Sequence, residues 1–148
     1  MRTLEEVLEA WKEDCQLPRA DLDEASRNTP ALHAKYLEAR SIAKLRLKDA
    51  EMKQKILLKN KWLWYNGKMN QAQINQLGWD YDPLDGLKIM KGEMDYYYDS
   101  DKEIQESELK IQYLKTTIDT LTDIVDALKW RHQTIGNMIK WKVFEAGG

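Results

Sequence analysis

An apolar heptad repeat in the last third of the chain constrains the fold more than any other feature. Its members alternate three- and four-residue steps over five repeats, at Ile104, Ser107, Ile111, Leu114, Ile118, Leu121, Val125, Leu128, His132, Ile135 and Ile139. The repeat predicts a helix from about Asp101 to Val143. A helix of about 40 residues spans ~60 Å, which one side of a compact domain cannot cover. We therefore expect the stripe to pack either on other copies of the chain or on an antiparallel helix of the same chain.

A second long helix is predicted upstream of the heptad repeat. Thr29-Pro30 is typical of an N-cap followed by proline at the first helical position, and no breaker occurs before Asn66-Gly67. On a helical wheel of about 100° per residue, an apolar stripe adjoins a basic stripe. The apolar stripe, rich in small residues, contains Leu32, Tyr36, Ala39, Ala43, Leu47, Ala50 and Leu57, and the basic stripe contains Arg40, Lys44, Lys48, Lys55 and Lys59.

Shorter elements are predicted in the rest of the chain. Thr3 and Glu6 stand in capping-box register before an apolar helical pattern that ends at Leu17-Pro18. Residues 70–78 fit two helical turns capped at both ends, and residues 79–100, which are acidic and aromatic, fit an ordered irregular connection. The sequence thus predicts an all-α protein: short N-terminal helices, a long basic helix, an irregular acidic connection and a long C-terminal heptad helix.

Charge is distributed unevenly, although the formal net charge is only −2. Residues 35–68 carry ten basic and three acidic side chains, whereas residues 80–108 carry ten acidic and three basic ones. A charged helix face is often simply solvated, but here the bases cannot all form compensating i, i+4 pairs. They also lead directly into Trp62, Trp64 and Tyr65. Lysines beside aromatic rings are typical of surfaces that bind single-stranded nucleic acid with little sequence preference.

We therefore predict a binding site for single-stranded nucleic acid on this helix. The predicted phosphate-binding residues are Arg40, Lys44, Lys48, Lys55, Lys59 and Lys61. Trp62 and Trp64 are candidates for base stacking. Because the two tryptophans lie about 200° apart around a helix, at most one of them can share the lysine face.

No catalytic or metal site is indicated by the sequence. Cys15 is the only cysteine, which excludes an internal disulfide and a cysteine zinc site. Gly67-Lys68 lacks the upstream glycine of a phosphate-binding loop. Residues 80–86 approach a calcium loop with the wrong spacing, and Lys91 stands where the bidentate glutamate belongs. We expect a non-enzymatic protein with no cofactor or metal.

No apolar run reaches the ~18 residues of a membrane span, and the first residues do not form a signal peptide. We therefore expect a cytoplasmic protein that has no membrane contact.

Three segments of the chain resemble the UvsY family, the recombination mediator proteins of T-even-type phages. They are LEEVLEAWKEDCQL near the N-terminus, LLKNKWLWYNGK at the end of the basic helix, and the ending IVDALKWRHQTIGNMIKWKVFEAGG. The terminal Phe-Glu-Ala-Gly is the most specific of these features. The resemblance covers nearly the whole chain and is weakest over residues 69–108, to which we transfer no function.

The resemblance implies an all-helical protein that forms ring-shaped homo-oligomers through its C-terminal helices, as a hexamer or heptamer. It implies binding to single-stranded DNA and loading of a phage RecA-type recombinase onto strands coated by the phage single-strand-binding protein. The implied setting is phage recombination, repair and replication in the cytoplasm of the infected bacterial host. A Leu-Lys-x-basic motif associated with DNA binding in the family matches Leu58, Lys59 and Lys61. The family usually has an aliphatic residue at the position of Trp62.

We accordingly expect one continuous domain, in which residues 1–100 form the DNA-binding region and residues 101–148 the oligomerisation helix. The expected oligomerisation residues are Ile111, Leu114, Ile118, Leu121, Val125, Leu128, Ile135 and Ile139. Two alternatives stay open from the residues alone. One is a structural coiled-coil assembly or scaffold protein of a virion, and the other is a regulatory subunit that binds an acidic protein.

Overall fold

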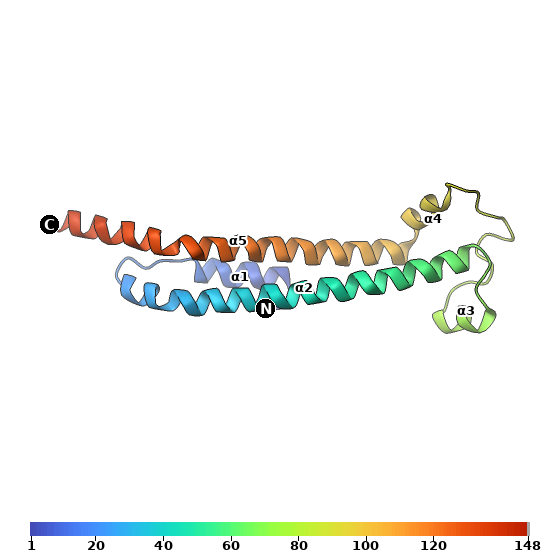
Figure 1. The fold of residues 1–148 in the computed structure, drawn as a ribbon, viewed down its shortest axis with the longest axis horizontal. Coiled ribbons are helices and arrows are strands. Elements are labelled where there is room, and N and C mark those ends of the chain that lie inside the picture. The colour runs from blue at the N-terminus through green and yellow to red at the C-terminus, as the bar shows by residue number, and fades with distance from the viewer. Residues whose placement is uncertain (148) are drawn as a thin grey trace. The chain divides into compact units, whose positions relative to one another are not determined.

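The computed structural model describes residues 1–147, which form five α-helices and no strand (Figure 1). The helices are α1 (Leu4–Asp14), α2 (Leu22–Tyr65), α3 (Gln71–Leu77), α4 (Met94–Ser100) and α5 (Lys102–Glu145). The predicted all-α class is confirmed. Helix α5 begins and ends close to the bounds that the heptad repeat predicts, whereas α4 was not expected in the irregular connection.

Helix α2 begins at Leu22, well before the predicted start at Pro30, so that prediction is wrong. The Thr29 hydroxyl donates to the carbonyl of Ala25 at 2.9 Å and does not cap a helix. Pro30 lies inside the helix, where it removes one backbone donor. Leu22 and Ala25 are buried with Ile135. This packing stabilises the helical turns before Pro30, although Thr29-Pro30 is locally typical of a helix start.

The described residues form two compact units. Unit 1 comprises Met1–Leu47 with the described part of Tyr113–Gly148, and unit 2 comprises Lys48–Gln112. Helices α2 and α5 each contribute residues to both units.

In unit 1, α1 packs with segments of α2 and α5 that run in opposite directions (Figure 1). Tyr36 is fully buried at the centre, with its ring edge-to-face on Trp11 at 5.6 Å between centroids. Its hydroxyl donates to the carboxylate of Asp14 at 2.7 Å, so the buried oxygen is satisfied. The core comprises Val7, Tyr36, Ala43, Leu121, Ile124, Val125 and Leu128.

Much of the heptad stripe of α5 packs within its own chain, which is one of the two arrangements that we expected for it. Leu121, Val125 and Leu128 belong to the core of unit 1, and Ile111 is buried in unit 2. Of the eight expected oligomerisation residues only Ile139 is largely exposed. The heptad repeat requires a packing partner but does not specify which one. In unit 1 the partners are α1 and the small-residue stripe of α2.

In unit 2, the short helices α3 and α4 follow one another along the chain between α2 and α5. Asn70 caps α3 by accepting from the backbone N–H of Gln73 at 2.8 Å. Gly78 ends the same helix with a left-handed φ of 72°, so residues 70–78 form the two predicted turns. Asp101 caps α5 in the same way, accepting from the N–H of Ile104 at 3.1 Å.

Replacing Leu121 by alanine tests the intrachain packing of the heptad stripe. Leu121 is 1% exposed, so Leu121→Ala should lower the free energy of unfolding by about 2–5 kcal/mol in urea titrations. Leu109 on the same helix is 71% exposed, and Leu109→Ala should change that free energy by less than about 0.5 kcal/mol. Equal effects of the two substitutions would contradict the packing described for α5.

Candidate nucleic-acid interface

The eight residues expected to contact DNA all lie on α2, between Arg40 and Trp64. The helix stops at Asn66-Gly67, where Gly67 has a φ of 65°. The N–H of Lys68 then bonds to the carbonyl of Leu63 at 2.8 Å, which closes a glycine-capped helix end. Arg40 and Lys44 belong to unit 1, and the other six residues belong to unit 2.

Four of the predicted lysines are exposed on α2: Lys44, Lys48, Lys55 and Lys59. None of them forms an ion pair with an acid among residues 1–147. Lys53, which lies outside this stripe, is instead paired with Asp49 at 2.9 Å. We call the three of these lysines that belong to unit 2, together with Trp62, the lysine face: Lys48, Lys55, Lys59 and Trp62. An uncompensated cationic stripe attracts a polyanion more strongly than one neutralised by its own acids.

Arg40 contributes less to this face than predicted. Its side chain is half-buried, and its Nε is enclosed without a hydrogen-bond partner among the described residues. Its guanidinium is therefore only partly available to an external phosphate.

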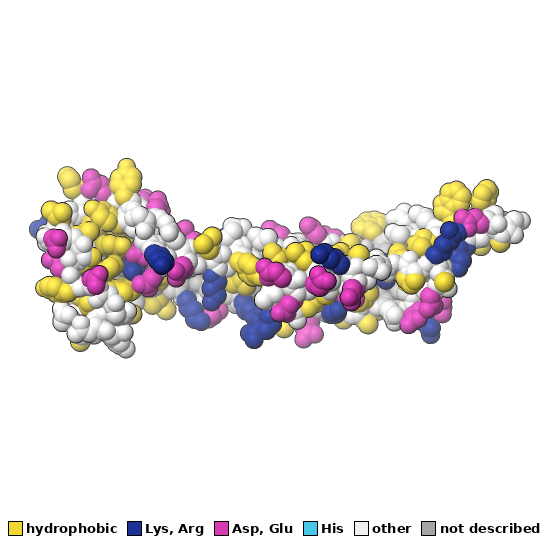
Figure 2. All heavy atoms as spheres, turned by 180° about the vertical axis from the view of Figure 1, so that it is seen from behind, with side chains coloured by type: hydrophobic (Ala, Val, Ile, Leu, Met, Phe, Trp, Pro, Cys, Tyr) yellow, Lys and Arg dark blue, Asp and Glu magenta, His cyan; other side chains and the backbone are white. Residues whose placement is uncertain are grey.

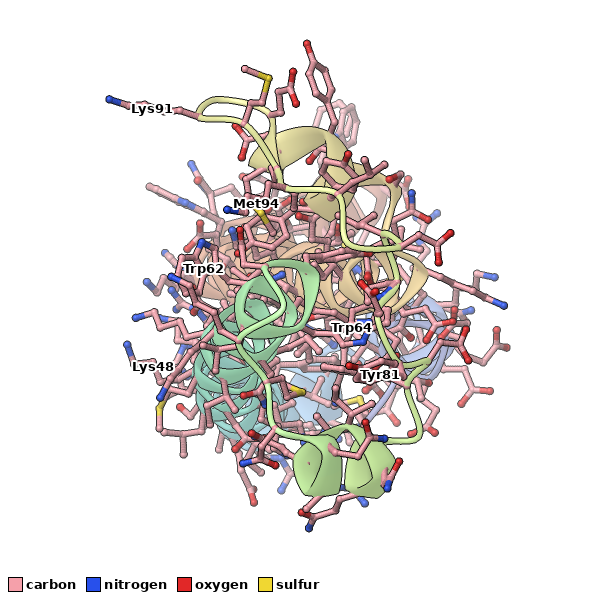
Figure 3. All side chains as sticks on the ribbon, turned by 90° about the vertical axis from the view of Figure 1, so that its right-hand side faces the viewer. Lys48, Trp62, Trp64, Tyr81, Lys91 and Met94 are labelled. Carbon is pink, nitrogen blue, oxygen red and sulfur yellow. The ribbon has the colours of Figure 1, made fainter. Side chains whose placement is uncertain are left out.

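Trp62 is the tryptophan that shares the lysine face. It is 40% exposed, and the Nζ of Lys68 lies 4.6 Å from its ring centroid. Trp62 lies at about 40° on the wheel that places the lysines between about 0° and 100°. Figure 3 shows Trp62 and Lys48 on the same side of α2. The ring is thus positioned to stack on a base of a strand that follows the lysines.

Trp64 lies on another side of the helix and belongs to the fold of unit 2 (Figure 3). Its ring packs on Tyr65 at 4.8 Å and on Trp79 at 5.0 Å between centroids. Its Nε1 donates to the carbonyl of Asp80 at 2.7 Å. These contacts hold the indole within unit 2, so we retain only Trp62 as a stacking candidate.

Of the predicted phosphate-binding residues, Lys61 departs most from the prediction, which required an exposed side chain. The residue is only 3% exposed, and its Nζ lies 3.1 Å from Asp101 and 3.3 Å from Glu103. The same nitrogen lies 4.5 Å and 4.1 Å from the ring centroids of Trp64 and Trp79. The helical period already contains this signal, since Lys61 falls at about −60°, inside the apolar stripe.

The carboxylate of Asp101 is held in its charged form. Burial raises its pKa, but hydrogen bonds from Tyr65, from the N–H of Ile104 and from Lys61 outweigh burial and leave the pKa below its ordinary value. The Tyr65 hydroxyl donates to Asp101 at 2.6 Å, and burial together with this carboxylate raises the pKa of Tyr65. At neutral pH the Asp101 side chain beside Lys61 is thus a carboxylate.

The acidic segment before α5 carries exposed aromatic and aliphatic side chains. Tyr81, Leu87, Met90 and Tyr96 are each largely exposed. Tyr98, in contrast, donates to the carbonyl of Leu58 at 3.2 Å and serves the packing of unit 2. The surrounding carboxylates repel phosphate, so this segment is unsuited to DNA.

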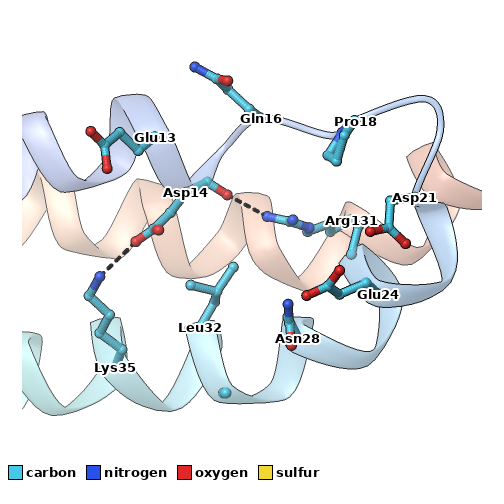
Figure 4. Close-up of a pocket in the computed structure, with 12 residues that line it drawn as sticks. Glu13, Asp14, Gln16, Pro18, Asp21, Glu24, Asn28, Leu32, Lys35 and Arg131 are labelled. Atoms are coloured by element: carbon cyan, nitrogen blue, oxygen red, sulfur yellow. Dashed lines mark hydrogen bonds and ion pairs between the residues drawn. The ribbon is translucent and has the colours of Figure 1, made fainter.

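A hollow in unit 1 is also unsuited to phosphate (Figure 4). Its two cations are already engaged: Lys35 pairs with the Asp14 carboxylate at 2.8 Å, and Arg131 donates to the Asp14 carbonyl at 2.7 Å. The neighbouring Asp21 raises the pKa of the Glu24 carboxyl, as expected for crowded acids. The acids that line the hollow are Glu13, Asp14, Asp21 and Glu24.

Within residues 1–147, no group of three or more His, Cys, Asp or Glu side chains is arranged to hold a metal ion. None of the helices described for these residues combines the length and apolarity that a membrane crossing requires.

The pH dependence of stability tests the lowered pKa of Asp101. A carboxyl with a depressed pKa in the folded state stabilises that state above its unfolded pKa of about 3.9 and loses this contribution as the pH falls through the folded value. Urea midpoints measured from neutral pH to pH about 3 should therefore converge between wild type and Asp101→Asn in acid. The exposed Asp99→Asn is the matched control and should give no such convergence. A constant difference between wild type and Asp101→Asn would contradict the assignment.

The chain was compared with known families, curated proteins and solved structures. The profile of the family described as "Recombination, repair and ssDNA binding protein UvsY" matches residues 10–148. No curated protein matches. Among solved structures, a crystal structure of the bacteriophage T4 recombination mediator protein UvsY (lattice type II) superposes with a TM-score of 0.80 at 26% identity, covering 99% of this chain and 98% of that one.

Two further crystal forms of the T4 protein have the same fold. Lattice type I gives a TM-score of 0.79 at 24% identity and covers 95% of this chain and 98% of that chain. Lattice type IV gives 0.77 at 24% identity and covers 98% and 99%. Because the family profile spans all but the first nine residues and the fold agrees along the whole length, this chain belongs to the UvsY family.

Proposed function

We propose that this chain is a recombination mediator that binds single-stranded DNA through the lysine face. In this role it promotes loading of a RecA-type recombinase onto strands coated by a single-strand-binding protein. The observation that carries the proposal is the alignment of three exposed lysines, which form no ion pair, with one exposed tryptophan in the unit 2 part of α2, in a chain that belongs to the UvsY family. It acts in phage recombination, repair and replication, in the cytoplasm of the infected host.

The composition of the lysine face supports sequence-independent binding. Lysines attract the phosphate backbone and release its counterions, and an exposed indole stacks on any base. Neither contact reads a base edge. The face therefore suits a protein that must act on whatever strand is exposed during recombination.

The C-terminal end of α5 is the surface that we propose for homo-oligomerisation into a ring. With the heptad stripe used inside the chain, exposed apolar side chains gather here, visible in yellow in Figure 2. Trp141 and Phe144 pack edge-to-face at 5.5 Å between ring centroids and remain largely exposed. The exposed apolar side chains at this end are Ile139, Trp141, Val143 and Phe144, of which Trp141 and Phe144 share one side of the helix. An exposed patch of several large apolar side chains is typical of a protein interface.

A ring of subunits also explains how a chain with a net charge of −2 can hold DNA. Each lysine face binds weakly, and repetition around the ring raises the overall affinity through effective concentration. Individual contacts can open one at a time, so the strand is released to the recombinase without one large barrier.

Fluorescence anisotropy with a labelled oligo-dT over a salt series tests the proposed function. We expect binding whose log K falls linearly with log[salt], with a slope of about −0.7 for each phosphate contacted. Trp62→Ala should weaken binding by about 1–3 kcal/mol per stacked base, and Trp62→Phe, which keeps a ring, should retain most of the affinity. No binding at low salt would overturn the proposal and favour a scaffold protein.

Sedimentation velocity tests the proposed oligomerisation surface. The double variant Trp141→Ser, Phe144→Ser should sediment as a smaller species than wild type while keeping its helical circular dichroism, because both side chains are exposed in the chain. Leu109→Ser, at an equally exposed position of α5, is the control and should keep the wild-type assembly. An unchanged sedimentation coefficient in the double variant would place the subunit contact elsewhere.

A further inference from the structure

Lys61 is surrounded by groups that compensate its positive charge. Its Nζ is shared between the carboxylates of Asp101 and Glu103 and lies against the faces of Trp64 and Trp79. The side chains of Lys61 and Asp101 are each only 4% exposed. A phosphate could reach this ammonium only by displacing a buried carboxylate, which would leave a second negative charge uncompensated.

Lys59 and Lys61 also point to different sides of α2. Two residues correspond to a rotation of about 200° around a helix, so a strand lying on one of these lysines cannot lie on the other. Their exposure agrees with this geometry, since Lys59 is exposed and Lys61 is buried. The two cations of the Leu-Lys-x-basic motif thus have different surroundings in one fold.

The groups around Lys61 connect the end of α2 to two other elements of unit 2. Asp101 caps α5 and also accepts from the Tyr65 hydroxyl at 2.6 Å. Glu103 accepts from the indole Nε1 of Trp79, which follows α3, at 2.7 Å. The last turns of α2 carry Lys59 and Trp62, and helix ends open most readily when nothing anchors them. The contacts of Lys61 with Asp101 and Glu103 are among those that hold this end in place.

We propose that Lys61 is a positioning residue, which holds the end of α2 through Asp101 and Glu103 so that Lys59 and Trp62 face the DNA, and that it contacts no phosphate itself. This inference rests on the proposed DNA binding of the lysine face. It assigns the two cations of one short motif to two roles, phosphate contact for Lys59 and anchoring for Lys61.

Lysine labelling of the intact protein tests the placement of Lys61 without any substitution. Reductive methylation followed by peptide mass spectrometry would be run with and without saturating oligo-dT. Lys59 should react readily in the free protein and be shielded several-fold by the oligonucleotide. Lys61 should react at least about tenfold more slowly than Lys59 in both conditions, because modification requires local opening. Labelling of Lys61 as fast as Lys59, with shielding by DNA, would overturn the proposal.

Salt-dependent binding of matched variants tests the role of Lys61. Lys59→Ala should reduce the slope of log K against log[salt] by about 0.7 for each subunit in contact. Lys61→Met alone leaves Asp101 buried without its cation and should weaken DNA binding with the slope unchanged. The double variant Lys61→Met, Asp101→Asn removes both charges, keeps an apolar stem between the two tryptophans, and should restore the affinity to within about twofold of wild type.

The failures of the two proposals are distinguishable. If wild type binds with a steep salt slope and the folded double variant loses slope as Lys59→Ala does, Lys61 contacts phosphate and only the positioning role is overturned. If wild type shows no salt-dependent binding, the proposed function fails and the positioning role fails with it. Should Lys61→Met not fold, the double variant and the labelling experiment still decide between the two roles.

Discussion

The apolar stripe of α5 has to be covered, and the structure depends on how the chain covers it. In unit 1 the stripe packs on α1 and on the small-residue stripe of α2, around the buried ring of Tyr36. This packing fixes which side of α2 is interior, because the helical period allows only one apolar side at a time. Basic side chains that take no part in packing are left on the surface of α2.

The number of basic residues overstates how much charge is available to DNA. Lys35 is paired with Asp14, Lys53 with Asp49, and Lys61 with Asp101. A cation on the interior side of α2 is tolerated only when carboxylates accompany it, because an unpaired buried charge is costly. Acids of α1, of α2 itself and of the N-cap of α5 thus divide one continuous basic segment into lysines that are paired within the chain and lysines that are not.

Local periodicity and capping signals predicted α1, α3, α5 and most of α2, but neither α4 nor the packing partners of the long helices. The heptad repeat predicted α5 closely, and the capping signals at Asn70 and Gly78 predicted α3. The heptad repeat could not distinguish packing within the chain from packing between subunits, because both bury the same apolar stripe. The start of α2 was missed since packing around Leu22 overrides the signal at Pro30. The burial of Lys61 was foreseeable from its wheel position, whereas its carboxylate partners depend on tertiary contacts.

The proposed site of three lysines and one ring would have a consequence for a bound strand. If lysines contact the phosphates and Trp62 stacks on a base face, the hydrogen-bonding edges of the bases stay unoccupied. A recombinase that pairs strands needs these edges free. Tight base readout would compete with it, whereas attraction to the backbone does not. In the proposed positioning role, Lys61 would keep Trp62 and Lys59 in register, so that modest contacts suffice without base-specific hydrogen bonds.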